Sequence, residues 1–111
     1  MDCIFCKILK GEIGADVVLK EDGIFAFKDI KPQAPHHILI IPEKHIATIN
    51  DLGDEDAAIV GKMVLAAKKI AKKLGVQSYR LVFNCNADAG QEVFHIHLHF
   101  LAGRKFTWPP G

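Results

Sequence analysis

The sequence predicts one α+β domain in which helices cover one face of a mostly antiparallel sheet of about five strands. The order of local patterns predicts this class, because a short helix, three strands and a long helix precede two further strands. Half of the 111 residues are hydrophobic, which suffices for one core and leaves little room for a second. No repeat, linker or low-complexity segment interrupts the chain. We therefore expect a single domain over residues 1–111.

Turn and capping signals define the first elements. We expect, in chain order, a helix over residues 3–10, strands over 17–19, 24–27 and 37–41, a helix over 54–74, and strands over 79–83 and 93–101. Gly11 can close the first helix. The dipeptide Asp22-Gly23 is typical of a tight hairpin, so the first two strands should be antiparallel. Pro42 ends the third strand, whose unbroken apolar run predicts burial on both faces.

The second half of the chain predicts a long amphipathic helix ahead of two strands. Apolar residues recur there at intervals of three and four, at Ile59, Met63, Ala67, Ile70 and Leu74. Gly75 stands where a helix C-cap is expected. A polar, glycine-containing loop over residues 84–91 then leads into the last strand.

Histidines alternate with large apolar residues in that last strand. In an extended chain this period of two puts His95, His97 and His99 on one face, with successive rings about 6.6 Å apart. The other face is an apolar strip that should pack into the core. A lone histidine would suggest an ordinary half-buried side chain, but three titratable groups in a row predict a reaction site. We expect the row on the sheet face that the helices leave open.

Charge and composition exclude several classes of function. Fourteen lysines and arginines nearly balance thirteen acidic residues, and neither sign forms a long block, so no groove for DNA or RNA is indicated. A small anionic ligand remains possible. The chain has neither a leader-like start nor an apolar run of membrane-spanning length, which predicts a cytoplasmic protein without membrane contact. Three cysteines, an odd number, argue for reduced thiols or metal ligands.

Cys3 and Cys6 are separated by one helical turn, so both sulfurs can face the same way. His45 and His95 are the candidates for two further ligands. Two thiolates and two imidazoles would close a tetrahedral zinc site with no open position, so the metal would be structural. In the alternatives, the cysteines are buried small hydrophobes or a redox pair, and His95, His97 and His99 hold a catalytic metal instead.

The run His95-Ile96-His97-Leu98-His99-Phe100-Leu101 resembles the signature of the histidine triad (HIT) family. Further similarity extends over nearly the whole length and looks like the nucleotide-binding Hint branch. It is carried by Asp29-Ile30, Pro32 to Pro35, His37, Asn84, Gly90-Gln91 and the tail Trp108-Pro109-Pro110-Gly111. Paired cysteines occur in bacterial-type members, where the first histidine of the motif helps to bind zinc. The resemblance implies a HIT-like α+β fold, a homodimer and no organic cofactor.

The resemblance also implies chemistry at the α-phosphate of a purine nucleoside phosphoramidate or an aminoacyl adenylate. His97 would attack phosphorus and form a nucleotidyl-histidine that water hydrolyses. Its second ring nitrogen would be held by an acceptor, commonly a backbone carbonyl. His99 and His37 would bind phosphate oxygens and stabilise the developing charge. A protein that binds or senses a purine mononucleotide without needing turnover is the alternative reading, since binding requires the same pocket.

Matching positions imply the substrate contacts. Asn84 and the backbone N–H groups of Gly90 and Gln91 would surround the phosphate, and Asp29 would accept the ribose hydroxyls. An apolar pocket for the base would be formed by Phe5, Ile8, Phe27 and Ile30, although each could equally be ordinary core.

Two positions bear on the leaving group and the partner subunit. Glu92 stands where many relatives carry a hydroxyl residue that assists the leaving group, and it would act as a general acid only if its pKa were raised. Trp108 would reach the partner's site in the homodimer. As a monomer, the chain would instead fold Trp108 back on its own domain.

Overall fold

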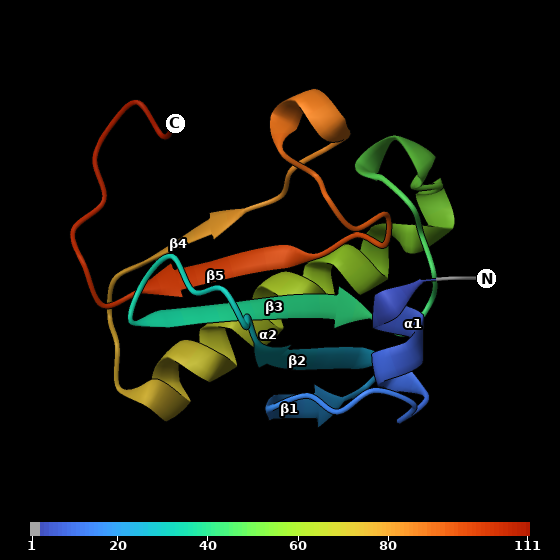
Figure 1. The fold of residues 1–111 in the computed structure, drawn as a ribbon, viewed down its shortest axis with the longest axis horizontal. Helices are drawn as coiled ribbons and strands as arrows, with labels where there is room; N and C mark the ends of the chain where they lie inside the picture. Colours follow the sequence, from blue (N-terminus) through green and yellow to red (C-terminus); the bar gives the residue numbers. More distant parts are fainter. Residues whose placement is uncertain (1–2) are drawn as a thin grey trace.

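The structure, a computed structural model, describes residues 3–111, so the first two residues of the expected domain lie outside the described part. A five-stranded sheet has the strand order β1-β2-β3-β5-β4, and each neighbouring pair is antiparallel (Figure 1). The elements are α1 (Ile4–Leu9), β1 (Val17–Glu21), β2 (Ile24–Lys28), β3 (His36–Pro42), α2 (Ala57–Leu74), β4 (Tyr79–Val82) and β5 (Leu98–Ala102). The predicted α+β class is confirmed.

The turn between β1 and β2 has the geometry that its sequence predicts. Asp22 and Gly23 have φ angles of 53° and 80°, and two successive positive φ angles are typical of a type I′ hairpin turn. The central strand β3 is buried along its length except for a half-buried His36, as its apolar run predicts. Among the described residues, no helix is both long enough and apolar enough to span a bilayer.

The two helices lie on opposite faces of the sheet, which corrects the expectation that helices cover one face. Helix α2 packs behind the sheet on alternate residues such as Ile38 and Ile40. Helix α1 instead inserts Phe5 among residues of the other face, including Phe27 and Leu39 (Figure 1). Because α1 is only 6 residues long, it covers one end of that face, and the remainder stays available for a site.

Two elements begin later than the sequence predicts. Helix α2 starts at Ala57 and follows a separate 3₁₀ turn (η2, Asp54–Asp56), in which the Asp56 carboxylate accepts the N–H of Gly53. Strand β5 starts at Leu98, so the expected strand over residues 93–101 is wrong at its beginning. The N–H of Ile96 donates to the carbonyl of Ile46 at 2.7 Å instead of joining the sheet. His95 and His97 therefore lie in an irregular segment ahead of the strand.

Candidate active site

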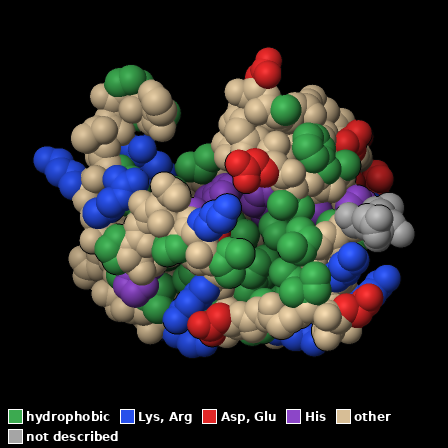
Figure 2. Space-filling model, in the orientation of Figure 1, with side chains coloured by type: hydrophobic (Ala, Val, Ile, Leu, Met, Phe, Trp, Pro, Cys, Tyr) green, Lys and Arg blue, Asp and Glu red, His purple; other side chains and the backbone are tan. Residues whose placement is uncertain are grey.

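Three histidine rings meet on the sheet face opposite α2. His99 of β5 lies opposite Leu39 of β3, and its ring centroid is 4.9 Å from that of His97 and 5.2 Å from that of His37. Figure 2 shows histidine side chains gathered along a furrow across this face. The structure thus brings together the three residues that the sequence assigns to catalysis.

The ring of His97 is oriented by a main-chain carbonyl. Its Nδ1 lies 2.8 Å from the carbonyl oxygen of His95, and a carbonyl can only accept, so Nδ1 carries the hydrogen. The edge-to-face contact with Phe5, at 5.1 Å between ring centroids and 90° between planes, fixes the ring from the side. Burial lowers the pKa of His97. A neutral imidazole whose Nε2 bears a free lone pair follows from these contacts.

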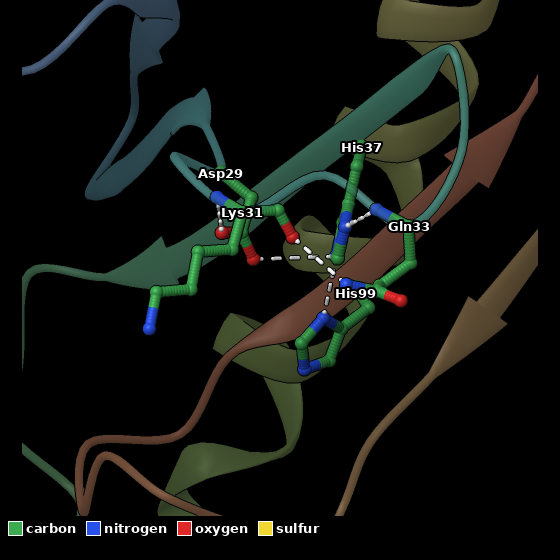
Figure 3. A network of polar contacts seen from close by, with 5 residues as sticks. All are labelled: Asp29, Lys31, Gln33, His37 and His99. Atoms are coloured by element: carbon green, nitrogen blue, oxygen red, sulfur yellow. Dashed lines mark hydrogen bonds and ion pairs between the residues drawn. The ribbon is translucent and has the colours of Figure 1, made fainter.

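His37 and His99 form a second hydrogen-bonded chain, drawn in Figure 3. The backbone N–H of Gln33 donates to Nδ1 of His37 at 3.0 Å, so the hydrogen of a neutral His37 sits on Nε2. That atom lies 2.9 Å from Nδ1 of His99 and 3.4 Å from the Asp29 carboxylate. When His37 donates to His99, the hydrogen of His99 must sit on its outer nitrogen, Nε2, which points away from His37 (Figure 3).

Burial keeps these rings neutral. Burial is the main cause that lowers the pKa of His37, against an opposing effect of Asp29. The pKa of His99 falls to about 4, mainly through burial and further through the neighbouring His97 and His37. Adjacent rings consequently present different groups to the furrow: a lone pair on His97 and an N–H donor on His99. This pairing suits attack at an atom that carries an anionic oxygen.

The loop after β4 differs in detail from the expected phosphate cradle. The N–H of Gly90 already donates to the carbonyl of Ala87 at 2.9 Å, and that of Gln91 donates to Asn86 at 3.1 Å. Both amides therefore donate within the loop in this structure, and their contact with a phosphate stays a prediction. A Cβ placed on Gly90 would contact Nδ2 of Asn84 at 3.6 Å, so the Asn84 side chain lies directly beside this glycine.

The side chain of Gln91 has a structural role that the sequence does not reveal. Its Nε2 donates to the carbonyls of Ala47 and Val93 at 2.8 and 3.1 Å, and its Oε1 accepts the N–H of Asn86 at 2.8 Å. Gln91 is buried and connects three separate stretches of backbone. A glutamine in a polar loop gives no sign of this in the sequence.

The four residues expected to contact the base differ in exposure. Phe5 and Phe27 are buried and meet edge to face, with centroids 5.5 Å apart. Ile8 is half-buried beside them, whereas 92% of the surface of Ile30 is exposed. The two phenylalanines thus belong to the core, whereas Ile30 is exposed to solvent. One carboxylate oxygen of Asp29, next to Ile30, accepts the N–H of Lys31 at 2.8 Å. Its other oxygen lies 3.4 Å from Nε2 of His37.

Glu92 and Trp108 lie at the surface. Glu92 is exposed and lines a hollow of about 500 Å³ with Phe94 and His45. Trp108 is 82% exposed, so the alternative in which it folds back on its own domain is wrong. The base of the tail is nevertheless anchored, because Arg80 donates to the carbonyl of Thr107 at 2.9 Å.

Cys3, Cys6, His45 and His95, hereafter the Cys/His cluster, bring four ligand atoms within 4.8 Å of one another. The Sγ atoms of Cys3 and Cys6 lie 3.5 and 3.6 Å from Nδ1 of His95, and Nδ1 of His45 lies 3.2 Å from that atom. Tetrahedral ligands at zinc bond lengths would be separated by about 3.5 Å for sulfur to nitrogen and about 3.3 Å for nitrogen to nitrogen. The donor set and its spacing therefore fit a metal ion.

The Cys/His cluster uses His95 in a way that separates it from the other two histidines of the motif. Its Nε2 lies 2.8 Å from the carbonyl of Pro42, so this nitrogen donates and Nδ1 is free to bind a metal. Within the described residues, His95, His97 and His99 do not form a set of converging ligand atoms. The alternative of a catalytic metal held by these three histidines is not supported. All three cysteines are free, and no disulfide forms between Cys3 and Cys6.

Comparison with known proteins shows to which family this chain is related. Residues 2–107 match the family described as "Scavenger mRNA decapping enzyme C-term binding". An uncharacterized HIT-like protein of Synechocystis is 49% identical over 99% of this chain and 97% of its own. The purine nucleoside phosphoramidase of Escherichia coli K12 is 49% identical over 93% of this chain and 88% of its own. The crystal structure of a HIT family hydrolase from Legionella pneumophila has a TM-score of 0.96 and 57% identity, covering 99% and 100% of the two chains.

The antiparallel sheet with histidines along one face, together with these relatives, places the protein in a class of hydrolases with an α+β fold. The chain belongs to the histidine triad (HIT) family. The resemblance read from the histidine motif is confirmed.

Proposed function

We propose that the protein hydrolyses purine nucleoside phosphoramidates or aminoacyl adenylates at the α-phosphate, with His97 as nucleophile. Nε2 of His97 attacks phosphorus and forms a P–N bond, while the P–N bond to the amine of a phosphoramidate, or the P–O bond to the carboxylate of an aminoacyl adenylate, breaks. Water then attacks the same phosphorus, which releases a nucleoside monophosphate and regenerates His97. The observation that carries this proposal is the 2.8 Å contact of His97 Nδ1 with the His95 carbonyl, because it leaves Nε2 as a free nucleophile.

Neighbouring groups support the roles assigned to the substrate contacts. The outer N–H of His99 can donate to a phosphate oxygen. The pKa of His99 is lowered to about 4, so this ring stays neutral and does not repel the positive charge that develops on His97 when His97 bonds to phosphorus. The Asp29 carboxylate, 3.4 Å from Nε2 of His37, would bind the ribose hydroxyls. The Asn84 amide, which lies beside Gly90, would bind a phosphate oxygen. Ile30, exposed and next to Asp29, would contact the base. The name of the 49% identical phosphoramidase supports the choice of substrate class.

We assign the Cys/His cluster to a structural zinc ion. Four protein ligands would complete a tetrahedron, so zinc would tie the start of α1 to the segment before β5 without contacting substrate. Measurement of total metal in the purified protein tests this assignment, with an expected value near one zinc per chain. The double variant Cys3→Ser, Cys6→Ser should lose the metal, whereas Cys85→Ser should keep it. Full zinc occupancy in the double variant would refute the assignment.

We further propose a cytoplasmic homodimer in which the tail of each subunit reaches the partner's site. The exposure of Trp108 supports this, because a large aromatic side chain on a tail anchored at Thr107 is suited to contact a second surface.

Turnover distinguishes the proposed enzyme from a protein that merely binds nucleotides. Wild-type protein and His97→Ala are incubated with an adenosine phosphoramidate, and product and adenylylated protein are followed by mass spectrometry. Wild type should release AMP and pass through an adenylylated histidine, whereas the variant should bind AMP without turnover. Absence of turnover in wild type that binds AMP would instead favour the binding protein.

A further inference from the structure

We propose that the Cys/His cluster positions the nucleophile, so that turnover depends on a metal that touches no substrate atom. Two links carry this coupling: the peptide carbonyl of His95 and the ring of Phe5. The inference rests on the proposed function, in which His97 attacks phosphorus, and it adds a role for the cluster beyond stabilising the fold.

His95 takes part in both arrangements at once. Its ring nitrogen Nδ1 faces the sulfurs of Cys3 and Cys6, and its Nε2 donates to the carbonyl of Pro42 at 2.8 Å. Its own carbonyl oxygen accepts from Nδ1 of His97, also at 2.8 Å. Because the ring and the carbonyl belong to one residue, an ion that holds the ring restricts the direction of the carbonyl. That direction sets both the tautomer and the aim of His97.

The segment that carries His95 and His97 is not paired in the sheet ladder. The ladder between β3 and β5 begins, at this end, with Leu98 opposite Ile40. Ahead of it, His95 donates to the carbonyl of Pro42, the last residue of β3, and Ile96 donates to the carbonyl of Ile46, next to the ligand His45. The ion would thus hold His95 directly and, through His45, the neighbouring residue Ile46 that accepts from Ile96. Within the described residues, no strand or helix holds His95 and His97 in place, because β5 begins only at Leu98.

Phe5 provides the second link. It lies between the ligands Cys3 and Cys6 at the start of α1, and its ring meets that of His97 edge to face at 5.1 Å. It also contacts the ring of His95 at 5.9 Å. Two ligands on one helical turn fix how this turn sits on the sheet. Loss of the metal would free the turn and loosen the contact that confines the nucleophile.

The groups that would bind the nucleotide lie outside this path. His37 and His99 are on paired strands, and Gln33 fixes the ring of His37. Weakening the cluster should therefore reduce kcat while leaving nucleotide affinity nearly unchanged. A role in folding alone would lower the apparent kcat and the number of AMP sites per chain in calorimetry by the same factor, whereas mispositioning of His97 lowers kcat at an unchanged number of sites.

The test compares Cys6→Ser with the matched control Cys85→Ser, both purified in the presence of zinc. Turnover of an adenosine phosphoramidate, calorimetric binding of AMP and ¹⁵N NMR of the histidine rings are measured on each. We expect Cys6→Ser to lose between about tenfold and a hundredfold in kcat, the scale of a misplaced reacting group. Affinity for AMP should stay within about threefold, or less than 1 kcal/mol. The His97 ring should change from one Nδ1–H tautomer to a mixture.

Unchanged kcat and an unchanged His97 tautomer in a folded Cys6→Ser protein that has lost its metal would overturn the inference. So would a kcat that falls only in proportion to the number of AMP sites per chain. Should Cys6→Ser fail to fold, ¹¹³Cd NMR of cadmium-loaded wild type and His97→Gln replaces it, because the coupling is reciprocal. A shifted ¹¹³Cd resonance is expected, and identical resonances would refute the coupling. Failure of the proposed function would appear separately, as turnover that survives the loss of His97.

Discussion

Nε2 of His37 lies 2.9 Å from Nδ1 of His99, and this contact sets the hydrogen-bonding character of the furrow. Gln33 determines which nitrogen of His37 carries the hydrogen, and His37 in turn makes His99 a donor toward the furrow. His97 receives the opposite tautomer from the His95 carbonyl. Two neighbouring histidines of one motif are thus given different chemical roles by their backbone surroundings.

Removal of His37 should weaken the donor role of His99. In His37→Ala, Nδ1 of His99 loses its partner, and the ring can adopt either tautomer. One lost hydrogen bond corresponds to a decrease of about five- to tenfold in kcat/KM. His37→Gln keeps an N–H donor and should retain more activity than His37→Ala. Equal activity of both variants and wild type in steady-state assays would show that the contact does not matter for turnover.

His99 should remain neutral until strongly acidic pH. Its pKa falls from 6.5 to about 4 in the folded protein, so the unfolded chain binds more protons between these two values. The contribution of His99 to the free energy of unfolding is therefore fully present above pH 6.5 and is lost as the pH falls toward about 4. NMR titration of the ring checks the pKa, and urea unfolding of wild type against His99→Gln checks the slope. A His99 midpoint near 6.5 would contradict the prediction.

Gln91 should contribute strongly to stability. Gln91→Leu removes three hydrogen bonds from a buried side chain and leaves backbone groups of Ala47, Asn86 and Val93 without these partners. We expect a loss of about 2–4 kcal/mol in the free energy of unfolding. The control Gln33→Leu changes an exposed glutamine whose side chain has one backbone contact at 3.2 Å, and it should cost less than about 0.5 kcal/mol. Denaturant unfolding of both variants decides, and equal losses would refute the assignment.

The tail after Thr107 should matter for assembly or substrate choice. Truncation after Thr107 removes exposed Trp108 but retains the contact of Arg80 with the Thr107 carbonyl. We expect a lower mass in light scattering or an altered preference among leaving groups. Trp108→Ala serves as the single-residue counterpart. A truncated chain with the mass and the substrate preference of wild type would remove the proposed role.

Local signals in the sequence were sufficient for most of the fold. Asp22-Gly23 forms the hairpin turn, because these two residues tolerate positive φ angles. Apolar spacing identified α2 as a helix and the buried strand β3. The same signals could not place α1 on the opposite face from α2, because a short apolar helix can pack on either. The period of two in the histidine motif also extended beyond the true strand, since pattern does not reveal where the ladder hydrogen bonds begin.

The site was predictable in its residues but not in its connections. The alternating pattern indicated His97 and His99, the family resemblance indicated His37, and spacing indicated Cys3 and Cys6. The tautomers depend on carbonyl and N–H groups of the backbone, which carry no residue-specific signal. The engaged amides of Gly90 and Gln91 follow from the closed loop over residues 86–91. The sequence therefore indicated which side chains form the site, and the backbone geometry decides whether each ring offers a lone pair or an N–H donor.

The most direct measurement is turnover of an adenosine phosphoramidate by wild type and His97→Ala, with covalent adenylylation followed by mass spectrometry. The account predicts that the variant loses at least about a thousandfold in kcat and forms no adenylylated protein, while it still binds AMP. Turnover at the wild-type rate by His97→Ala, or adenylylation at another residue, would contradict it.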